Sequence, residues 1–562
     1  MNRENGGWGW AIWLAPPVAV GIALRLTRLT PQILTGDELH TVNGAIQRTV
    51  LEIVQSWTYR GADYCVPLTA FFRFLMDRGI VLSEMDFRLP MLAAGILTVA
   101  VAPVALATHL GRRAAVLLGW LLATSYLLVM YSRIVRSYGP VVLLGFAAVM
   151  AFECWWRTRS RSAAAGYVAC AALASYFHLG AAPFVFAPLV YGALEWFRGR
   201  TAAAAGQRSG PGIAAVAGLS AAAGGLLTLL LLPARASLLE LVRAHGRGSL
   251  PALADWGDVL QLLLGTTAWP LTLLLSLAIA RGAWRSYRRA PDFVLYIATL
   301  VAVHCIGLAV LAPNYLEVPA VASRYLLVLL PFLLGFAAVG LTDPWASSAT
   351  PRVRAAGWSA VAALGVALVA GGPLARPVLR STSFAHSGPA LFFTQPPDRM
   401  PAEDVPGFYR ELAQAPDDGR GGLLEFPWMN LASRALRIYQ DIHGREVLVG
   451  LADARLADAP IAYRNIVDPD PEAFLASRAR YLVVHLRQQE EEWRIESANP
   501  HANAAVRDLP GFWSALTNSA LRMVSRLRAD WGEPVYEDSA IRVWDLDLVR
   551  SVQVPGFDAQ PE

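Results

Sequence analysis

The chain has 562 residues, of which 55% are hydrophobic and only 16% are charged. Soluble domains average about 25% charged residues, so this composition excludes an ordinary soluble globular protein and predicts a polytopic α-helical membrane protein. The net charge of +5 is carried entirely by arginine, because the sequence contains no lysine. In a membrane protein such an excess reflects cytoplasmic loops, and we expect no nucleic-acid partner.

Eleven apolar segments are long enough to cross the membrane, whose ~30 Å hydrocarbon layer takes about 20 apolar residues. The first, Trp8 to Leu26, exceeds a signal-peptide core and has no small-residue cleavage site after it, so we expect it to be retained. The others begin near Phe87, Ala114, Ser137, Ala163, Ala181, Ile213, Val259, Phe293, Tyr325 and Ala356.

Arginines accumulate in alternate loops between these segments, which predicts that those loops are cytoplasmic. The N-terminus is then cytoplasmic, and we expect a multi-pass protein of the cytoplasmic (inner) membrane. Residues 1–375 form a transmembrane module with a large outer loop at 27–86, and residues 376–562 form a linker and an extracytoplasmic domain. The arginines concerned are Arg112, Arg113, Arg157, Arg159, Arg161, Arg198, Arg200, Arg208, Arg281, Arg285, Arg288, Arg289, Arg352 and Arg354.

The outer loop begins with Leu-Thr-Gly-Asp-Glu-Leu-His at residues 34–40, so Asp37 and Glu38 lie just after the first span. An apolar stripe at spacings of three and four predicts that a helix along the outer leaflet starts here. The Asp-Glu pair is either a capping box at the start of that helix or the carboxylate group of a reaction centre. Both hold if Glu38 caps while Asp37 projects into a cleft. The stripe comprises Leu39, Val42, Ile46, Val50, Ile53 and Trp57.

A second polar motif, Tyr-Ser-Arg-Ile-Val-Arg-Ser-Tyr at residues 131–138, lies between two later spans. Arginine is disfavoured in a short outer loop, so we expect Arg133 and Arg136 to have a specific partner. Guanidinium groups bind phosphate bidentately, and two of them three residues apart on one helical face suit a prenyl phosphate. The alternative is interfacial anchoring on lipid head groups. Arg324, before Tyr325 at the outer end of the tenth span, repeats the pattern.

The C-terminal segment has a different composition. Short strands are predicted at 422–426, 446–451, 481–486, 534–537 and 540–545, with helices at 430–443, 471–480 and 513–531 between them. This alternation predicts a small α/β domain of about 180 residues. It contains no Gly-rich phosphate loop and no nucleophile motif, so we expect it to support the membrane module or to recognise the acceptor.

Five motifs in this order resemble the bacterial dolichyl-phosphate-mannose protein mannosyltransferase-like proteins of the GT-C superfamily, which are similar to the lipid A aminoarabinose transferases. They are the early Asp-Glu pair, Glu84 to Pro90, Gly111 to Arg113, Ser132 to Tyr138, and Ser323 to Tyr325 before Pro331. The resemblance implies inverting sugar transfer from a polyprenyl phosphate on the outer face. It implies that Asp37 is the catalytic residue of the Asp-Glu pair. Together with the arguments above, the candidate catalytic residues are Asp37 and Glu38, and the candidates for binding the donor phosphate are Arg133, Arg136, Tyr138 and Arg324.

Other residues are candidates for binding substrate or a divalent metal ion, although none forms a recognisable metal spacing. Tyr176-Phe177-His178 resembles the family's Tyr-Thr-His stretch, while a packed or interfacial histidine is the alternative. The family commonly carries His-Pro-Pro where this chain has Cys65-Val66-Pro67, a departure that affects the donor pocket. The candidates are His40, Tyr64, Asp86, His178 and His245.

The expected function is therefore transfer of a sugar from a polyprenyl-phosphate donor to a lipid, glycan or protein acceptor of the cell envelope. Asp37 would deprotonate the acceptor hydroxyl, and the arginines would stabilise the departing phosphate. Two alternatives stay open. One is a non-catalytic homologue that binds prenyl phosphate, and the other is a transporter or flippase of lipid-linked sugars. Transporters carry ionisable groups near the bilayer midplane, and here only His304 lies deep in a predicted span.

Overall fold

The structure is a computed structural model that describes most of the apolar half of the chain and parts of the C-terminal half. The described residues are 8–27, 29, 38–59, 62–63, 65–80, 82–203, 212–239, 249–266, 268–313, 316–346, 359, 363–367, 374, 400, 402–416, 421–427, 434–445, 447–448, 471–475, 477, 479–487, 490 and 512–553.

The chain divides into two compact units. The first, called the helical unit, comprises Met1–Thr27, Val50–Ala70 and Leu89–Arg376. The second, called the tail unit, comprises Arg28–Thr49, Phe71–Arg88 and Pro377–Glu562. The tail unit therefore contains two parts of the predicted outer loop as well as the C-terminal domain.

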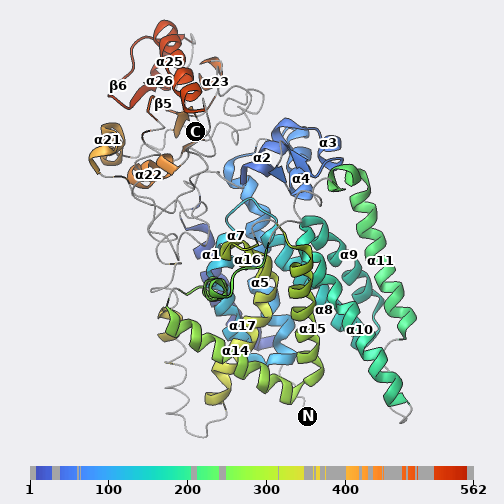
Figure 1. Ribbon diagram of the computed structural model, residues 1–562. Helices are drawn as coiled ribbons and strands as arrows, with labels where there is room; N and C mark the ends of the chain where they lie inside the picture. The colour runs from blue at the N-terminus through green and yellow to red at the C-terminus, as the bar shows by residue number, and fades with distance from the viewer. Residues whose placement is uncertain are drawn as a thin grey trace. The chain divides into compact units, whose positions relative to one another are not determined.

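Helices of the helical unit run alongside one another in Figure 1. Helix α8 packs on α9, α9 on α10, and α10 on α15. The elements are η1 (Trp8–Leu14), α1 (Ala15–Leu26), α3 (Val50–Val54), β1 (Thr58–Tyr59), β2 (Ala62–Asp63), α4 (Val66–Asp77), α5 (Glu84–Leu110), α6 (Arg112–Ala123), α7 (Tyr126–Tyr131), α8 (Tyr138–Thr158), α9 (Arg161–Phe177), η2 (Leu179–Ala181), α10 (Ala182–Ala203), α11 (Ile213–Leu231), η3 (Leu232–Ala234), η4 (Leu253–Asp255), α13 (Trp256–Leu264), α14 (Trp269–Arg289), α15 (Pro291–Leu311), α16 (Pro319–Tyr325), η5 (Leu326–Leu329) and α17 (Leu330–Ala346). Helices α4 and α5 each contribute residues to both units.

Seven helical segments among the described residues are long and apolar enough to cross a membrane, and an eighth is a pair bent by 77°. These segments confirm the polytopic helical class. The seven are Gly9–Leu26, Met85–Leu110, Tyr138–Thr158, Leu179–Arg198, Ile213–Leu239, Pro291–Leu311 and Pro319–Thr342, and the bent pair is Leu253–Leu264 with Trp269–Arg289.

Two of the eleven predicted spans are shorter than expected. The segment near Ala114 forms two helices, α6 and α7, separated at Thr124 and Ser125. Thr124 bonds its hydroxyl to the Trp120 carbonyl, and Ser125 is extended, so polar side chains compete with the helical backbone here. The segment near Ala163 forms α9, whose 17 residues fall short of a full crossing. The last predicted span, near Ala356, lies largely outside the described residues.

The closest helix packing in this unit is between α14 and α17. A Cβ on Gly282 would lie 1.7 Å from the Phe336 carbonyl oxygen, and one on Gly340 would lie 2.0 Å from that of Ala278. Only glycine permits the two backbones to approach this far. Small residues at a helix crossing are the usual means of close packing between apolar helices in a membrane, where the hydrophobic effect does not drive association.

The predicted outer-loop helix is divided into two, α2 (Glu38–Gln47) and α3 (Val50–Val54). Its apolar stripe is buried, with Val42 and Ile53 fully enclosed and Ile46 and Trp57 each 5% exposed. Trp57 packs edge-on against Tyr176, with ring centroids 5.8 Å apart. The stripe is therefore a packing surface within the protein.

The C-terminal part of the tail unit is a five-stranded sheet of order β4-β3-β5-β7-β6, confirming the predicted α/β domain. Strands β3, β4 and β5 are parallel, whereas β7 is antiparallel to β5 and β6. The elements are η7 (Ala402–Asp404), α21 (Gly407–Gln414), β3 (Leu423–Phe426), α22 (Arg434–His443), β4 (Val447–Leu448), α23 (Pro471–Leu475), β5 (Tyr481–His485), α25 (Phe512–Trp531), β6 (Tyr536–Glu537), β7 (Ile541–Asp545) and α26 (Leu546–Gln553).

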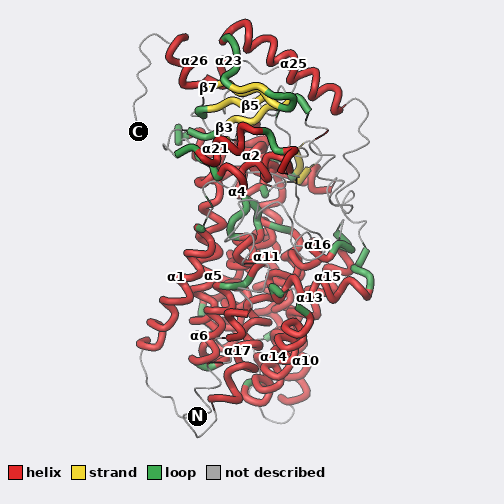
Figure 2. The backbone as a smooth tube through the Cα atoms, turned by 90° about the vertical axis from the view of Figure 1, so that its left-hand side faces the viewer, coloured by secondary structure: helices red, strands yellow, loops and turns green. Residues whose placement is uncertain are grey.

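Helices cover both faces of this sheet (Figure 2). Alternate residues of each strand point to opposite faces. Leu424, Leu482 and Trp544 pack with α23, α25 and α26 in an apolar core. Their neighbours Glu425 and His485 therefore point to the other face, where α21 and α22 lie.

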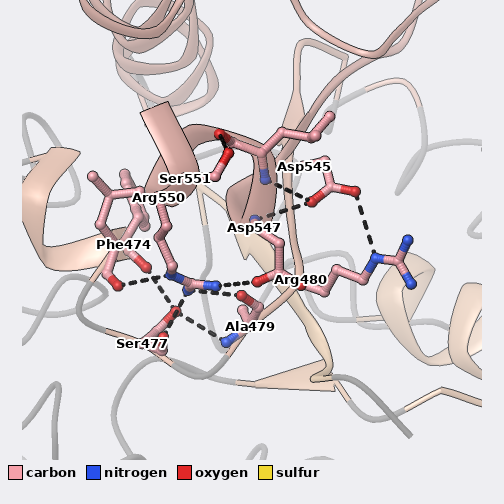
Figure 3. Close-up of polar contacts among 10 residues, drawn as sticks. Phe474, Ser477, Ala479, Arg480, Asp545, Asp547, Arg550 and Ser551 are labelled. Atoms are coloured by element: carbon pink, nitrogen blue, oxygen red, sulfur yellow. Dashed lines mark hydrogen bonds and ion pairs between the residues drawn. The ribbon is translucent and has the colours of Figure 1, made fainter. Parts of the chain in front are cut away.

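Arg550 holds helix α26 in place (Figure 3). Its guanidinium donates to the carbonyl oxygens of Leu475, Ser477 and Ala479 at 2.7 to 3.0 Å and pairs with Asp547 at 2.7 Å. The three carbonyl oxygens fasten α26 to the segment that leads into β5, while Asp547 pairs with Arg550 within α26.

Candidate functional site

The arginine motif of residues 131–138 forms a turn between α7 and α8. Its residues are mostly buried, with Ser132 1% and Arg133 0% exposed, while Arg136 is half-buried. Residues 132–137 are not helical, so the expectation that Arg133 and Arg136 share a helical face is wrong. The turn forms because α8 begins only at Tyr138, where Pro140 occupies the first helical turn, a position that proline tolerates.

Arg133 holds the end of the first span. Its Nη1 donates to the carbonyl oxygens of Leu24 at 3.1 Å and Thr27 at 2.8 Å. Carbonyls at a helix C-terminus lack intrahelical donors and carry the negative end of the helix dipole, so a guanidinium is well matched to them. Part of the Arg133 side chain therefore fixes α1, and the more exposed Arg136 is better placed to meet a ligand.

A further buried arginine, Arg25, fastens the same region from the opposite side. Its Nε donates to the Ser132 hydroxyl at 3.1 Å, and its Nη1 donates to the carbonyls of Gly21 and Ala123 at 3.0 and 3.4 Å. Arg25 was not among the site residues predicted from the sequence, although a charged residue at the end of an otherwise apolar span could have indicated it.

Tyr138, His178 and Arg324 gather around one narrow cavity. Its free volume is about 10 Å³, which is space for about one water molecule. The Arg324 guanidinium lies 5.7 Å from the Tyr138 ring centroid, and the His178 ring lies 5.3 Å from that of Tyr138. These side chains come from the start of α8, the end of α9 and the end of α16. Three separately predicted residues are thus brought together.

The orientation of His178 is set by the short helix η2. Its Nδ1 accepts a hydrogen bond from the Gly180 backbone N–H at 3.1 Å. In the neutral ring the proton is then on Nε2, which makes that atom a donor. The ring is bracketed by Tyr138 and Tyr325, each with its centroid 5.3 Å away.

Gly180 permits this arrangement because it has no side chain. A Cβ at this position would lie 2.7 Å from Cε1 of Tyr325 and 2.9 Å from Cε1 of His178. Both neighbours are rigid rings. An alanine here would push His178 and Tyr325 apart.

Glu38 belongs to the tail unit, where it forms a buried ion pair with Arg88. The Arg88 Nε lies 3.4 Å from Oε1 and its Nη2 lies 3.5 Å from Oε2, and the two side chains are 0% and 2% exposed. A buried charge without its partner is costly, so the pair is a structural requirement. Arg88 was part of a motif in the sequence, but the sequence did not indicate its partner 50 residues away.

Asp86 caps a helix. Its Oδ2 accepts from both the backbone N–H and the hydroxyl of Ser83 at 2.7 Å, and the Ser83 hydroxyl accepts from the Asp86 N–H at 3.3 Å. This reciprocal pair, three residues apart at the start of α5, is a capping box. One oxygen of Asp86 is therefore occupied, which leaves it a poor candidate for a metal or substrate ligand.

The remaining candidates are less informative. His40 is half-buried in α2. Asp37, Tyr64 and His245 lie outside the described residues. Within the described ranges, no three His, Cys, Asp or Glu side chains gather in a way that would hold a metal ion.

The tail unit contains a buried polar cluster that the sequence analysis missed. His485 Nε2 lies 2.7 Å from Glu425 Oε2, and the Tyr409 hydroxyl donates to the same oxygen at 2.9 Å. His443 stacks on Tyr409, and burial, with a smaller contribution from the charge of Arg445, lowers the pKa of His443 to about 3. The Glu425 and His485 side chains are fully buried, so this cluster braces α21 against the sheet.

Comparison by sequence finds no matching family model and no matching curated protein. Comparison of structures finds likenesses to two kinds of membrane enzyme. One is ArnT from Cupriavidus metallidurans, in structures with undecaprenyl phosphate bound and in the apo state, at 15% and 16% identity. They cover 85% and 84% of this chain and 93% and 92% of that one, both with a TM-score of 0.42.

The other is the oligosaccharyltransferase of Archaeoglobus fulgidus in its apo form. It is 11% identical, covers 88% of this chain and 72% of that one, and has a TM-score of 0.45. At these identities and scores the likeness carries no argument, and the functional argument rests on the residues of this chain.

Proposed function

We propose that this protein is a membrane glycosyltransferase that moves a sugar from a polyprenyl-phosphate donor to an acceptor hydroxyl on the outer face of the cytoplasmic membrane. One observation carries the proposal. Tyr138, His178 and Arg324 come from motifs up to 186 residues apart, yet they line a single cavity of the helical unit. Those motifs are also the ones by which the sequence resembles GT-C glycosyltransferases.

The residues suit recognition of a phosphate ester. Arg324 and Arg136 are each partly exposed, and a guanidinium keeps its charge at any relevant pH while matching two phosphate oxygens at once. His178 adds a neutral Nε2–H donor. Burial of the surrounding backbone and rings strengthens such contacts, because the local dielectric is lower than that of water.

The proposed reaction needs one base. The acceptor oxygen attacks the anomeric carbon while the bond from that carbon to the phosphate oxygen breaks, which inverts the configuration. The electron pair leaves with the polyprenyl phosphate, whose charge the arginines stabilise. The acceptor proton passes to a carboxylate, and we assign this role to Asp37 on the motif resemblance. Glu38 holds Arg88 and is assigned a structural part.

His304, the histidine that lies deep in a predicted span, favours neither the non-catalytic homologue nor the transporter. His304 is completely buried in α15, and its Nε2 lies 2.9 Å from the Tyr325 carbonyl oxygen. That contact fastens α16 to α15, as expected of a packing histidine rather than of a proton relay. It also positions Tyr325 beside His178.

The test is release of polyprenyl phosphate. Purified protein in vesicles is incubated with synthetic undecaprenyl-phosphate sugars and a cell-envelope lipid extract as acceptor, with and without EDTA. Acceptor-dependent release that is lost in Asp37→Asn supports the proposal, and its loss with EDTA would add a divalent ion. Donor binding without release would indicate the non-catalytic homologue, and movement of intact donor across the bilayer would indicate a flippase. A deletion strain should accumulate the unused donor, identifiable by mass spectrometry of its lipids.

A further inference from the structure

A second cavity lies at the other end of α8, far from Tyr138. It has a volume of about 370 Å³ and is open to one side. Trp156 lines it, 18 residues after Tyr138, so the two cavities are separated by about 27 Å along the helix axis. The proposed transfer reaction makes no use of this space.

Most of the charged side chains in the lining are carboxylates. Glu153, Glu195 and Asp292 converge from α8, α10 and α15, against one lining arginine, Arg157. Arg157 Nε and His109 Nε2 approach the same Glu153 oxygen, Oε1, at 2.8 and 3.4 Å, and Arg198 bonds Oε1 of Glu195 at 2.9 Å. Within the part of the chain that the structure describes, the other oxygen of each glutamate and the whole Asp292 carboxylate accept no hydrogen bond.

His109 is a second, independent observation that points to a ligand. Its side chain is only 8% exposed and lines the cavity, stacked on Phe293 with centroids 3.9 Å apart. Although Nε2 lies 3.4 Å from Glu153, it makes no hydrogen bond to any described residue. Buried polar atoms are nearly always hydrogen-bonded, so this nitrogen points to a polar ligand for the cavity.

The rest of the wall is aromatic. Phe152, Trp156, Tyr191 and Tyr296 form a continuous group with centroid separations of 5.1 to 6.2 Å. The two tyrosine hydroxyls already donate to the backbone carbonyls of Asp292 and Val149, so both tyrosines contribute aromatic rings to this wall. Aromatic faces together with carboxylates form the usual recognition site for organic cations.

We propose that this cavity binds the primary ammonium of an aminophospholipid head group. An ammonium has three N–H donors, and the lining offers three carboxylates with open acceptor oxygens. A quaternary amine has no donor and would leave them unsatisfied. The cavity lies at the ends of membrane-length helices, where head groups are found, and Arg157, 57% exposed at its rim, suits the adjoining phosphate.

The test measures lipid retention. Protein is reconstituted into vesicles of equal parts phosphatidylethanolamine, phosphatidylcholine and phosphatidylglycerol, extracted in mild detergent and analysed by native mass spectrometry. We expect selective retention of phosphatidylethanolamine, reduced roughly tenfold in the Glu153→Gln, Glu195→Gln double variant, since hydrogen bonds to a charged group are lost. Glu317→Gln, an exposed carboxylate of the same unit outside the cavity, is the matched control.

Asp292→Asn is a second test that does not depend on how the double variant folds. Asp292 is exposed at the start of α15, so its replacement should leave the fold intact. Equal retention of phosphatidylcholine, or unchanged retention in both variants, would overturn the proposal. Titration with soluble phosphoethanolamine separates the sources. Binding of this soluble amine in the absence of lipid retention would keep the ammonium site and overturn the lipid as its occupant.

Discussion

The two ends of α8 differ in both charge and space. At the Tyr138 end, Arg324 lines a cavity that holds about one water molecule. At the Trp156 end, three carboxylates surround about 370 Å³. Under the two proposals, one end of this helix accompanies an anion and the other a cation. The comparison teaches that a membrane helix with few charges can border a basic and an acidic environment, because each end is surrounded by charged residues of different neighbouring helices.

The largest expected effect tests the proposed base. Asp37→Asn removes the proposed base while keeping its shape, and turnover of a polyprenyl-phosphate sugar should fall about 100- to 10,000-fold with donor binding retained. Glu153→Gln, at the far end of α8, should leave turnover close to the parent value. Steady-state kinetics and donor retention check both variants. Full activity in Asp37→Asn would remove this residue from the mechanism.

The neighbouring carboxylate sharpens the same assignment. Because Glu38 is the buried partner of Arg88, Glu38→Gln should destabilise the protein by about 3 to 5 kcal/mol, much more than loss of a helix cap. Thermal unfolding of the purified protein measures this loss. The double variant Glu38→Gln, Arg88→Met should recover part of it, since no uncompensated charge then remains. A single variant as stable as the parent would mean that the ion pair is unimportant.

Alanine and lysine variants of Arg324 separate the effect of its charge on turnover from the effect of its planar guanidinium. Arg324→Ala should cost ~2 to 4 kcal/mol of transition-state stabilisation, which is roughly 30- to 1,000-fold in turnover. Arg324→Lys keeps the charge but loses the planar fork, so it should restore only part of the rate. Arg281→Lys on α14 is the control. Parent-like rates in Arg324→Lys would instead favour interfacial anchoring, where lysine substitutes freely.

The smallest expected effect concerns Arg133. Its bonds to the carbonyls of Leu24 and Thr27 predict that Arg133→Lys lowers stability by about 1 to 2 kcal/mol, because lysine cannot serve both acceptors with the same geometry. The effect on the KM for donor should be smaller than that of Arg136→Lys. Unfolding curves and donor titrations separate the two quantities. A large KM change with unchanged stability would make Arg133 a direct phosphate ligand.

Local pattern explains what could be predicted from the sequence. Strands β3 and β5 begin within one residue of their predicted positions, and seven of the predicted apolar segments form membrane-length helices among the described residues. Hydrophobic period and composition act over ten to twenty residues, so the sequence carries them directly. The breaks in the Ala114 segment and the outer-loop helix were not predicted, since they depend on side-chain hydrogen bonds and on packing of the pieces.

Partners distant in the chain could not be predicted in this way. Glu38 finds Arg88 across 50 residues, Ser132 finds Arg25 across 107, and Tyr138 meets Arg324 across 186. The acidic cavity likewise joins residues of α5, α8, α10 and α15. None of these residues has a local pattern that names its partner.

The sequence by itself thus determined the membrane class, the apolar segments, the α/β tail and the motifs that resemble glycosyltransferases, because each is a property of neighbouring residues. Only the tertiary structure decided which charges are neutralised, which are buried for packing, and which face a cavity. Those outcomes depend on distance and burial, which arise when helices far apart in the chain pack together. The same physical reason makes Arg133 a clamp on α1, Asp86 a helix cap, and Arg324 part of the wall of the narrow cavity beside Tyr138.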